Sequence, residues 1–482
     1  MYKIKFNTNI EAFENDFLDI IRAFDGYFLL DEMGEKMTLN IQKSDELQYQ
    51  VVIQCSYFDN DFVSSFSISN EYAMLKQKSL QKRYSKAILY DALSKLSGHS
   101  LPYGSLTGIR PTKLFKEILL QGQNAEDFFV NILNVSTEKT KLVETIVDNQ
   151  KKFYAEDDYA VDLFVNIPIC VSRCIYCSFL SAEFDKIKKL ITPYCDLLVE
   201  DIKNAKAMIK KYNFSVRSVY IGGGTPTSLD EKNFERVIQE CNIGCAEFTV
   251  EAGRPDTINK QKLDIMAQNG VTRISINPQT FNQKTLDFVG RKHTVEQIYE
   301  IYELARGYSF EINMDLIAML PNETFEDFCH SVDCALALSP SNITVHTLAL
   351  KRGSKLAEEG YNNFDATTPQ KMIQYSYEKI TSAGYNPYYM YKQKYVSGNL
   401  ENVGYCKPNT ACVYNIDIME ETNTIVACGA GGISKTVNHD NSRIERLANA
   451  KGIDVYLRRG DENYTKRDEF FAEFVASLKS DK

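Results

Sequence analysis

Between residues 160 and 350 the chain alternates short apolar runs with longer amphipathic segments, and this alternation constrains the fold more than any other feature. The apolar runs have the length of buried strands, and the amphipathic segments have the length of helices. Repeated strand and helix units of this kind build a parallel sheet. The expected strands are 161–167, 218–221, 247–251, 273–276, 310–316 and 342–348. The expected helices between them are 194–212, 231–240, 260–269, 295–307 and 325–338.

On both sides of this region, expected helices and strands follow one another without regular alternation. This change of pattern predicts three parts for the 482 residues. They are an α+β N-terminal domain (1–155), a βα core (160–350) and a small α+β C-terminal domain (351–482). The first part is expected to contain strands at 2–6 and 49–57 and helices at 12–24, 70–96 and 111–120. The last part is expected to contain a helix at 368–383, a strand at 423–428, a glycine-rich link at 429–432 and a charged terminal helix.

Composition excludes several classes of protein. The net charge is −9 without a long run of like charge, so nucleic acid is not an expected partner. No apolar stretch approaches the roughly 18 residues that span a bilayer, and the first residues lack the apolar core of a signal peptide. Twelve cysteines without an export signal favour thiols that are kept reduced. We therefore expect a cytoplasmic protein without a membrane span.

Three of these cysteines stand in a C-x3-C-x2-C loop directly after the first strand of the βα region. Cys170, Cys174 and Cys177 can converge on one metal centre, and soft thiolates select zinc, copper(I) or iron–sulfur clusters. A structural zinc site normally has four protein ligands, and the nearest further cysteine, Cys195, lies within the next expected helix. Three ligands on a four-iron cluster would leave one iron open, which is a catalytic arrangement. An incomplete zinc knuckle is the alternative.

A glycine triplet, Gly222 to Gly224, follows the second expected strand and is followed by Thr225 and Pro226. Glycines let the backbone approach a ligand closely, and their N–H groups can bind a carboxylate or a phosphate. A glycine triplet alone is more often a tight turn between a strand and a helix.

Polar residues continue at the carboxyl ends of the later strands. They are Glu251, Gln279, Asp315 and His346. In parallel βα barrels the ligand site is built at this edge, so these side chains are candidates for ligand contacts. Each has a structural alternative: Asp315 could cap a helix, and His346 could be a core histidine.

The cysteine loop and the downstream Gly-Gly-Gly-Thr-Pro sequence resemble those of the radical S-adenosylmethionine (SAM) superfamily. Within it, the chain is similar to the oxygen-independent coproporphyrinogen III dehydrogenase group of HemN, HemZ and HemW over about residues 160–432. The blocks at 106–112, 249–255, 273–281 and 289–293 are most similar to HemZ.

The resemblance implies an α/β fold whose core is a partial (βα)6 barrel. It also implies that Cys170, Cys174 and Cys177 hold a [4Fe-4S] cluster whose open iron binds SAM. Gly223, Gly224 and Thr225 would then hold the methionyl amino end, Tyr176 would lie beside the adenine, and Arg291 would suit the carboxylate. The full set of implied cofactor-binding residues is Phe164, Tyr176, Gly223, Gly224, Thr225, Glu251, Gln279, Arg291 and Asp315. No catalytic residue is implied beyond this site.

The implied activity is the oxidative decarboxylation of two propionates of coproporphyrinogen III to vinyl groups, a step of heme biosynthesis. It requires a reductant such as flavodoxin or ferredoxin and an external electron acceptor. A tyrosine-rich segment, 385–391, would suit a flat tetrapyrrole, although such a segment is more often core or interface.

The chain departs from the family pattern at three positions. Phe164 and Asn166 stand where the family has tyrosine and histidine, and Phe179 stands where HemN-type enzymes have a further cysteine. HemW-type heme-binding relatives lack that cysteine too. A heme chaperone on the same scaffold, or a radical enzyme with another substrate, therefore remain alternatives.

The other cysteines carry no expected chemistry. Cys241 and Cys245 flank the start of the third expected strand, at the opposite end from the candidate site, and are expected to pack. The spacing of Cys406, Cys412 and Cys428 matches no auxiliary cluster that we can justify.

Overall fold

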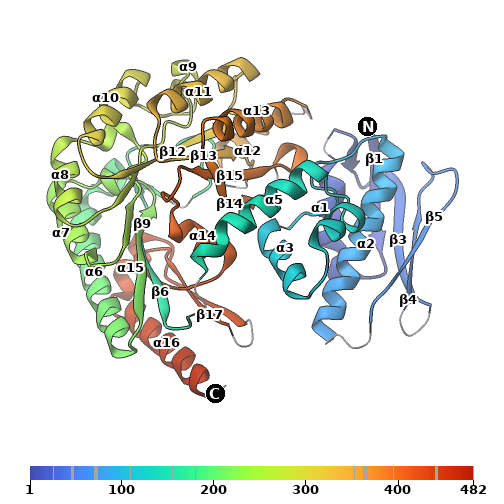
Figure 1. Cartoon of the computed structure of the whole chain (residues 1–482), viewed down its shortest axis with the longest axis horizontal. Coiled ribbons are helices and arrows are strands. Elements are labelled where there is room, and N and C mark those ends of the chain that lie inside the picture. Colours follow the sequence, from blue (N-terminus) through green and yellow to red (C-terminus); the bar gives the residue numbers. More distant parts are fainter. Residues whose placement is uncertain are drawn as a thin grey trace.

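The computed structural model describes the chain up to residue 480, except for positions 25, 45–47, 70–73, 109, 155–156, 180, 352, 362–366, 395 and 440–442. An eleven-stranded sheet with its helices forms the larger part of the molecule, and a five-stranded sheet with two helices forms the other end (Figure 1). The chain has an α/β fold with a partial barrel core, as expected.

Six parallel strands form the centre of the large sheet, in the order β6-β9-β10-β11-β12-β13. Their bounds are β6 (Ala160–Ile167), β9 (Ser215–Gly223), β10 (Glu247–Val250), β11 (Arg273–Ser275), β12 (Glu311–Ala318) and β13 (Asn342–Thr347). These are the six expected strands, with ends shifted by a few residues. The strands lie in the sheet in the same order as in the chain. Each strand and helix unit therefore packs beside the preceding one, and together the units form an open barrel.

The helices between these strands cover the outer face of the barrel (Figure 1). They are α6 (Phe184–Lys211), α7 (Glu231–Cys241), α8 (Lys260–Gln268), α9 (Gln283–Phe288), α10 (Val295–Arg306) and α11 (Phe325–Leu338). A short strand pair, β7 (Ile169–Cys170) with β8 (Ala182–Glu183), precedes α6.

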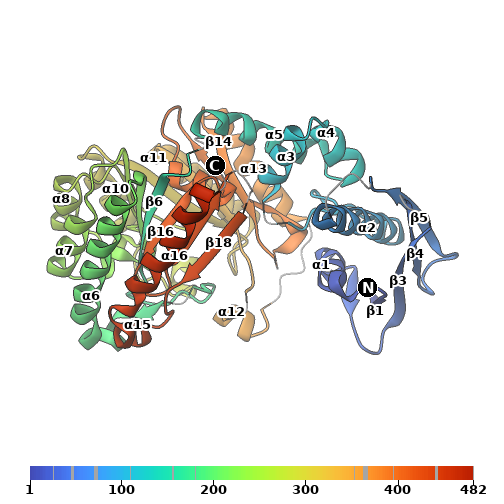
Figure 2. The same ribbon diagram turned by 90° about the horizontal axis from the view of Figure 1, so that it is seen from below.

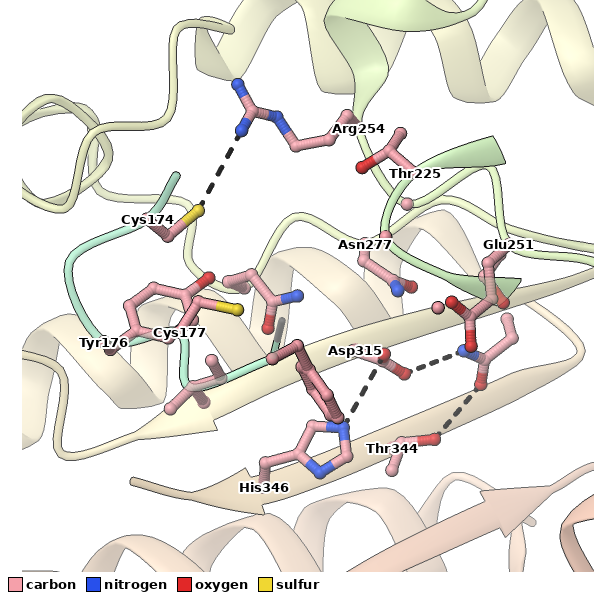
Figure 3. A pocket seen from close by; sticks show the side chains of 18 of the residues that line it. Cys174, Tyr176, Cys177, Thr225, Glu251, Arg254, Asn277, Asp315, Thr344 and His346 are labelled. Carbon is pink, nitrogen blue, oxygen red and sulfur yellow. Dashed lines mark hydrogen bonds and ion pairs between the residues drawn. The ribbon is translucent and has the colours of Figure 1, made fainter. Parts of the chain in front are cut away.

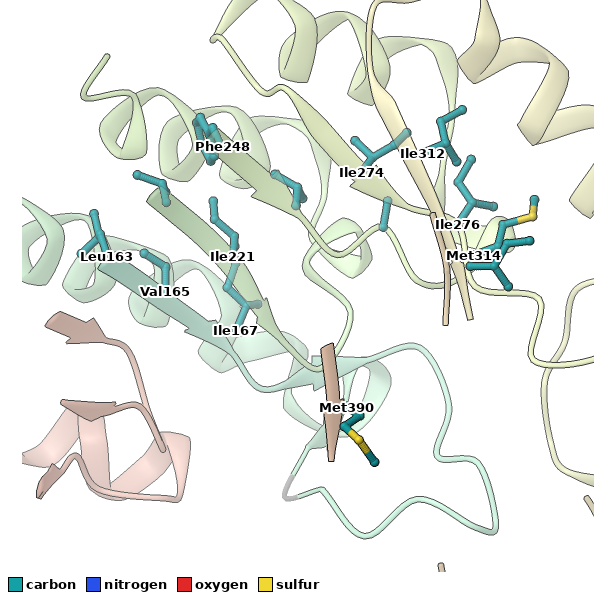
Figure 4. Packing of buried hydrophobic residues seen from close by; sticks show 14 of the residues in the cluster. Leu163, Val165, Ile167, Ile221, Phe248, Ile274, Ile276, Ile312, Met314 and Met390 are labelled. Carbon is teal, nitrogen blue, oxygen red and sulfur yellow. The ribbon is translucent and has the colours of Figure 1, made fainter. Parts of the chain in front are cut away.

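Side chains of the central strands form the main core between the sheet and these helices. Leu163, Val165, Ile221, Phe248 and Ile274 are fully or almost fully buried in it (Figure 4). Strands of a parallel sheet that is covered on both faces read as continuous apolar runs, which is why their positions could be predicted.

Polar caps fix where several barrel helices begin. The Asp230 side chain accepts a hydrogen bond from the Asn233 N–H at the start of α7, and Asn259 caps α8 in the same way. Thr294 and Thr324 form capping boxes at α10 and α11. Each cap satisfies N–H groups that the first helical turn leaves without partners.

Helix α6 differs from its expected range of 194–212, because it begins at Phe184 and continues through Pro193. Proline removes one backbone hydrogen bond from a helix interior. Buried side chains on both sides of it, Ile191 and Tyr194 among them, pack into the main core. This tertiary packing compensates for the lost bond.

The C-terminal segment extends the sheet at both edges. Beyond β13 lie the antiparallel strands β15 (Glu401–Cys406) and β14 (Asn386–Lys392). Beyond β6 lie β16 (Thr424–Cys428), which is parallel to β6, and then β17 (Ile433–Asn438) and β18 (Arg443–Ala448). The helices of this segment are α12 (Lys355–Glu358), α13 (Thr368–Ser382), α14 (Val413–Glu420), α15 (Ile453–Arg459) and α16 (Glu462–Ser480). Figure 2 shows β16, β18 and α16 running along one side of the core.

The N-terminal part has its own core. Its sheet has the order β2-β1-β3-β4-β5, and α1 and α2 cover the face that is turned toward the barrel (Figures 1 and 2). The bounds are β1 (Tyr2–Thr8), α1 (Glu14–Ala23), β2 (Phe28–Leu30), β3 (Glu35–Lys43), β4 (Gln48–Gln54), β5 (Phe62–Ser67) and α2 (Met74–Ser97). Two of these strands and both helices were expected, although the first four positions of the expected helix 70–96 lie outside the described residues.

Helices α3 (Pro111–Leu120), α4 (Ala125–Asp127) and α5 (Thr137–Gln150) connect the two ends of the molecule. At the start of α3, Arg110 and Lys113 form ion pairs of 2.8 and 2.7 Å with Glu421, and Thr112 donates to Glu420. Burial alone would raise the pKa of Glu421, but the two cations outweigh it and hold the pKa at about 2. Arg110 and Thr112 of the 106–112 block and the adjacent Lys113 therefore connect α3 to the carboxyl end of α14.

In the described part of the chain, no helix combines the length and the apolar character that a membrane crossing requires.

Candidate functional site

The three cysteines of the C-x3-C-x2-C loop lie together at the carboxyl end of β6. Cys174 is buried, Cys170 and Cys177 are half-buried, and all three are free thiols that line one pocket of about 390 Å³ (Figure 3). We call this cavity the deep pocket. The loop is held by a hydrogen bond from the Ile175 N–H to the Val289 carbonyl and by one from the Ser172 hydroxyl to the Gly290 carbonyl.

Burial raises the pKa of Cys177 to about 11. The free thiol is therefore protonated near neutral pH, and binding to a metal must release a proton. In the described residues, no three His, Cys, Asp or Glu side chains surround a single ion position. Ligands of a four-iron cluster each bind a different iron and lie farther apart than ligands of one ion.

The glycine triplet packs against the cysteine loop at the end of β9. Gly223 has a φ of +105°, and a Cβ on Gly224 would come within 2.6 Å of the Ile169 carbonyl oxygen. The N–H groups of Gly224 and Thr225 donate to the carbonyls of Ile167 and Ile169. The adjoining loop therefore already uses these two N–H groups.

The polar residues expected at the carboxyl ends of the strands do converge. Glu251, Gln279, Asp315 and His346 all line the deep pocket, together with the turn residues and Arg291 (Figure 3). Asp315 accepts a hydrogen bond of 2.8 Å from the Asn313 amide and lies 3.6 Å from His346 Nε2. On its other side, His346 Nδ1 is 3.1 Å from the Tyr391 hydroxyl.

Glu251 has the most strongly perturbed carboxyl group of the deep pocket. Burial, reinforced by the negative charge of Asp315, raises its pKa to about 7. A hydrogen bond of 2.7 Å from the Tyr220 hydroxyl opposes this shift. A Cβ on Gly222 would lie 2.8 Å from the Glu251 carboxyl carbon, so the carboxyl group packs directly against this glycine.

Arg291 is buried at 5% exposure, and its guanidinium donates to the carbonyls of Gly253 and Asn277 at 2.8 and 2.7 Å. These neutral partners fix the orientation of the guanidinium without neutralising its positive charge. The charge can therefore bind an anionic group of a ligand. In the described part of the chain, Arg291 Nε, Asn277 Oδ1 and Gln279 Oε1 are buried atoms without a hydrogen-bond partner. Buried polar groups are seldom left unpaired, so these atoms indicate a site for a polar ligand.

Phe164 does not line the deep pocket. It packs in a small cluster behind it, where its ring stacks on Tyr414 with the ring centroids 6.0 Å apart. Tyr220, on the neighbouring strand, stacks on the same Tyr414 ring and lines the deep pocket itself. Phe164 lies in mid-strand, six residues before Cys170, and is therefore separated from the site by one layer of rings.

Asn166 also lies outside the deep pocket. Its side-chain amide donates to the Ala430 carbonyl, and its own carbonyl accepts from the Tyr194 hydroxyl at 2.6 Å. A Cβ on Gly429 would come within 2.3 Å of the Asn166 carbonyl oxygen. The glycine-rich link 429–432 is thus a close packing contact behind β6.

Several site residues were missed or only partly foreseen. Arg254 forms a bidentate pair with Asp256 at 3.0 Å, and its Nη1 lies 3.9 Å from Cys174 Sγ (Figure 3). It directly follows the third barrel strand, so its position at the carboxyl edge was the available signal. Tyr388, Tyr389 and Tyr391 of the tyrosine-rich segment also line the deep pocket. The sequence alone did not decide whether they form a ligand-binding surface or belong to the core.

The remaining cysteines are free thiols in different surroundings. Cys241 is fully buried in the main core, and Cys245 packs against it, as expected. Cys412 lies 3.4 Å from Glu247 at the floor of the deep pocket. Cys428 instead contacts Arg467 at 3.2 Å, beside α6 and α16.

Comparisons with known proteins agree with this geometry. Residues 166–335 match the family model of the radical SAM superfamily. The chain is 36% identical over 412 residues to the oxygen-independent coproporphyrinogen-III oxidase-like protein HemZ of Bacillus subtilis (strain 168), covering 81% of each chain. It is also 32% identical over 195 residues to the heme chaperone HemW of the same organism, covering 39% of this chain and 50% of that one.

Among solved structures, the chain is similar to the coproporphyrinogen III oxidase HemN of Escherichia coli, which is a radical SAM enzyme. The TM-score is 0.51 with 20% sequence identity, and the match covers 66% of this chain and 73% of that one. At this identity the likeness shows the fold alone.

Proposed function

This chain belongs to the radical SAM superfamily as a HemZ relative, and from that premise we propose that it converts two propionates of coproporphyrinogen III into vinyl groups. The product would be protoporphyrinogen IX, an intermediate of heme biosynthesis. The observation that carries the proposal is one cavity lined by three free thiols and by polar side chains from successive strand ends. The cofactors of the superfamily are a [4Fe-4S] cluster and SAM.

The residues of the deep pocket fit both cofactors. Cys170, Cys174 and Cys177 would ligate the cluster, since soft thiolates suit iron–sulfur centres. The unpartnered buried atoms of Arg291, Asn277 and Gln279 would complete their hydrogen bonding with SAM. When bound, the two groups together supply a one-electron cleavage that yields a carbon-centred radical.

The chain's own side chains would orient SAM. The Glu251 carboxylate would accept from its amino group, and the fixed guanidinium of Arg291 would bind its carboxylate. Tyr176, whose hydroxyl lies 3.4 Å from Arg291, would lie beside the adenine. Carbonyl oxygens of the turn at Gly223, Gly224 and Thr225 would also accept from the amino group.

The opposite wall would exclude water from the reacting atoms. Tyr388, Tyr389 and Tyr391 present large aromatic faces there, and burial raises the pKa of all three hydroxyls. They therefore stay neutral at physiological pH. A closed aromatic wall prevents solvent from quenching a radical.

In the proposed reaction each propionate loses one hydrogen atom from its β-carbon, then CO2 and one electron. The electron needs an external acceptor, and the cluster needs a reductant protein such as flavodoxin or ferredoxin. We also propose a cytoplasmic location, because free thiols and a low-potential reductant coexist in a reducing compartment.

The proposal is tested by incubating anoxically purified protein with a reductant, SAM and coproporphyrinogen III. Mass analysis should find 5′-deoxyadenosine and a tetrapyrrole that has lost two molecules of CO2 and four hydrogen atoms. Cleavage of SAM without a vinyl product would instead indicate a radical enzyme with another substrate.

A heme chaperone is the second candidate, and two observations favour it. The chain is similar to HemW, and an exposed phenylalanine, Phe179, stands at the rim of the deep pocket where HemN-type enzymes have a cysteine. Stoichiometric heme binding without conversion of coproporphyrinogen III would select this candidate.

We expect SAM binding to weaken at acid pH through Glu251. Its pKa of about 7 means that the carboxylate, which is the form that accepts from an ammonium group, is lost as the pH falls below 7. Affinity should decline by about tenfold per pH unit below that value. Anoxic calorimetry of the cluster-loaded protein between about pH 5.5 and 8 measures this dependence.

The Glu251→Gln variant is the matched control. It keeps the size of the side chain and removes only the titrating carboxyl group. Weak binding that varies little with pH is expected. A variant with the same pH profile as the unmodified protein would contradict the role of Glu251.

A further inference from the structure

A second cavity, of about 520 Å³, lies where the N-terminal part of the chain faces the mouth of the barrel. We call it the outer cavity. One wall comes from α1 and β2 through Arg22, Phe28 and Leu29. The opposite wall comes from the loops after β12 and β13 through Met319 and Leu350.

The outer cavity shares a partition with the deep pocket. Leu348 and Gln393 line both cavities. Along the segment 348–351 the side chains then alternate, because Ala349 and Lys351 line the deep pocket and Leu350 lines the outer cavity. A ligand that reaches past this single segment can occupy both cavities.

The outer cavity combines apolar walls with positive charge. Leu29 is 42% exposed although it is a large apolar side chain, and Leu350 and the largely buried Phe28 and Met319 also line the cavity. Exposed apolar surface in a hollow is typical of a ligand site.

The charges around it favour an anion. Two cations, Arg22 and Lys394, and one carboxylate, Asp19, line the outer cavity, and Asp19 pairs with both cations at 3.5 and 2.7 Å. Lys351 lines the deep pocket on the other side of the partition. This local excess stands in a chain whose net charge is −9.

Size decides which ligand these cavities would share. The deep pocket, at about 390 Å³, is near the lower end of the range for one small-molecule site, and SAM would fill much of it. A tetrapyrrole is larger than the space that remains, so only a side chain of it can reach the deep pocket. Its ring needs an adjoining cavity with apolar walls and cations for the other carboxylates.

We propose that the outer cavity binds the macrocycle of the tetrapyrrole substrate while one propionate passes the partition at 348–351 into the deep pocket. This inference rests on the proposed function. It gives the N-terminal domain a role, because its first helix and second strand form one wall of the substrate site. Specificity for a flat tetracarboxylate would then depend on residues outside the barrel.

The test is the binding of coproporphyrin III, a fluorescent porphyrin with the same four carboxylates, to the cluster-loaded protein. Leu29→Glu places a negative charge in the apolar wall, and we expect the dissociation constant to rise at least tenfold. Leu350→Glu, on the opposite wall, should have the same effect. Leu119→Glu is the matched control, because Leu119 is equally exposed at 44% but lies on α3, outside the lining of both cavities.

Unchanged porphyrin binding in both cavity variants would overturn the inference, whatever the enzymatic outcome. Conversion of coproporphyrinogen III by the unmodified protein is measured separately. If both variants lose porphyrin binding but the unmodified protein makes no vinyl product, the outer cavity is supported and the proposed reaction is rejected.

Discussion

We expect a Cys174→Ala variant to lose SAM cleavage to background level while it remains folded. Cys174 is the buried member of the three loop cysteines, and the two remaining thiols cannot retain a four-iron cluster. The substitution removes only one sulfur atom, so the loop contacts at Ile175 and Ser172 persist. Anoxic measurement of 5′-deoxyadenosine, together with iron and sulfide content, reports the result.

Cys195→Ala is the control for this experiment. Cys195 is also fully buried and undergoes the same chemical change, but it lies within α6 in the main core. Its variant should cleave SAM at the normal rate. Full cleavage by the Cys174 variant would reject the assignment of the cluster ligands.

The second large effect concerns a buried ion pair that fixes the C-terminal helix to the barrel. Arg467, on α16, lies 2.5 Å from Asp201, on α6, and both side chains are almost completely buried. Asp201 also accepts from the Gly429 N–H and the Tyr456 hydroxyl. In Arg467→Met the Asp201 carboxylate keeps these neutral donors but loses its counter-charge.

Leaving a buried charge without its partner costs about 3–5 kcal/mol, so we expect the free energy of unfolding to fall by that amount. Urea denaturation of the protein measures the change. Asp468→Ala is the matched control, since Asp468 pairs with Lys211 across the same two helices but in solvent. Exposed pairs contribute about 0–1 kcal/mol, so equal losses in both variants would contradict this account.

The candidate site could be predicted to a large extent because of one geometric rule. In consecutive parallel strands, every carboxyl end lies at the same edge. Residues that follow different strands, such as Cys170, Glu251 and Asp315, must therefore meet, although they are far apart in the chain. The rule does not say which way each side chain points.

The sequence was least informative where a neighbour outside the local sequence decides the packing. Phe164 was expected at the cofactor but packs on Tyr414, which belongs to a helix far along the chain. The N–H groups of Gly224 and Thr225 donate to carbonyls of the adjoining loop, a contact that the glycine triplet by itself did not indicate. Helix α6 continues through Pro193 because core contacts on both sides compensate for the missing hydrogen bond.

The sequence by itself determined the six barrel strands, the cysteine loop and the edge of the sheet where the site is built. These depend on periodicity and chain order, which are local properties. Only the tertiary structure decided that the C-terminal strands extend both edges of the sheet, that tyrosines of β14 line the deep pocket, and that the N-terminal domain forms a wall of the outer cavity. These features depend on which distant surfaces bury one another. The free energy of this burial comes from pairs of segments, and the pattern of one segment alone does not specify its partner.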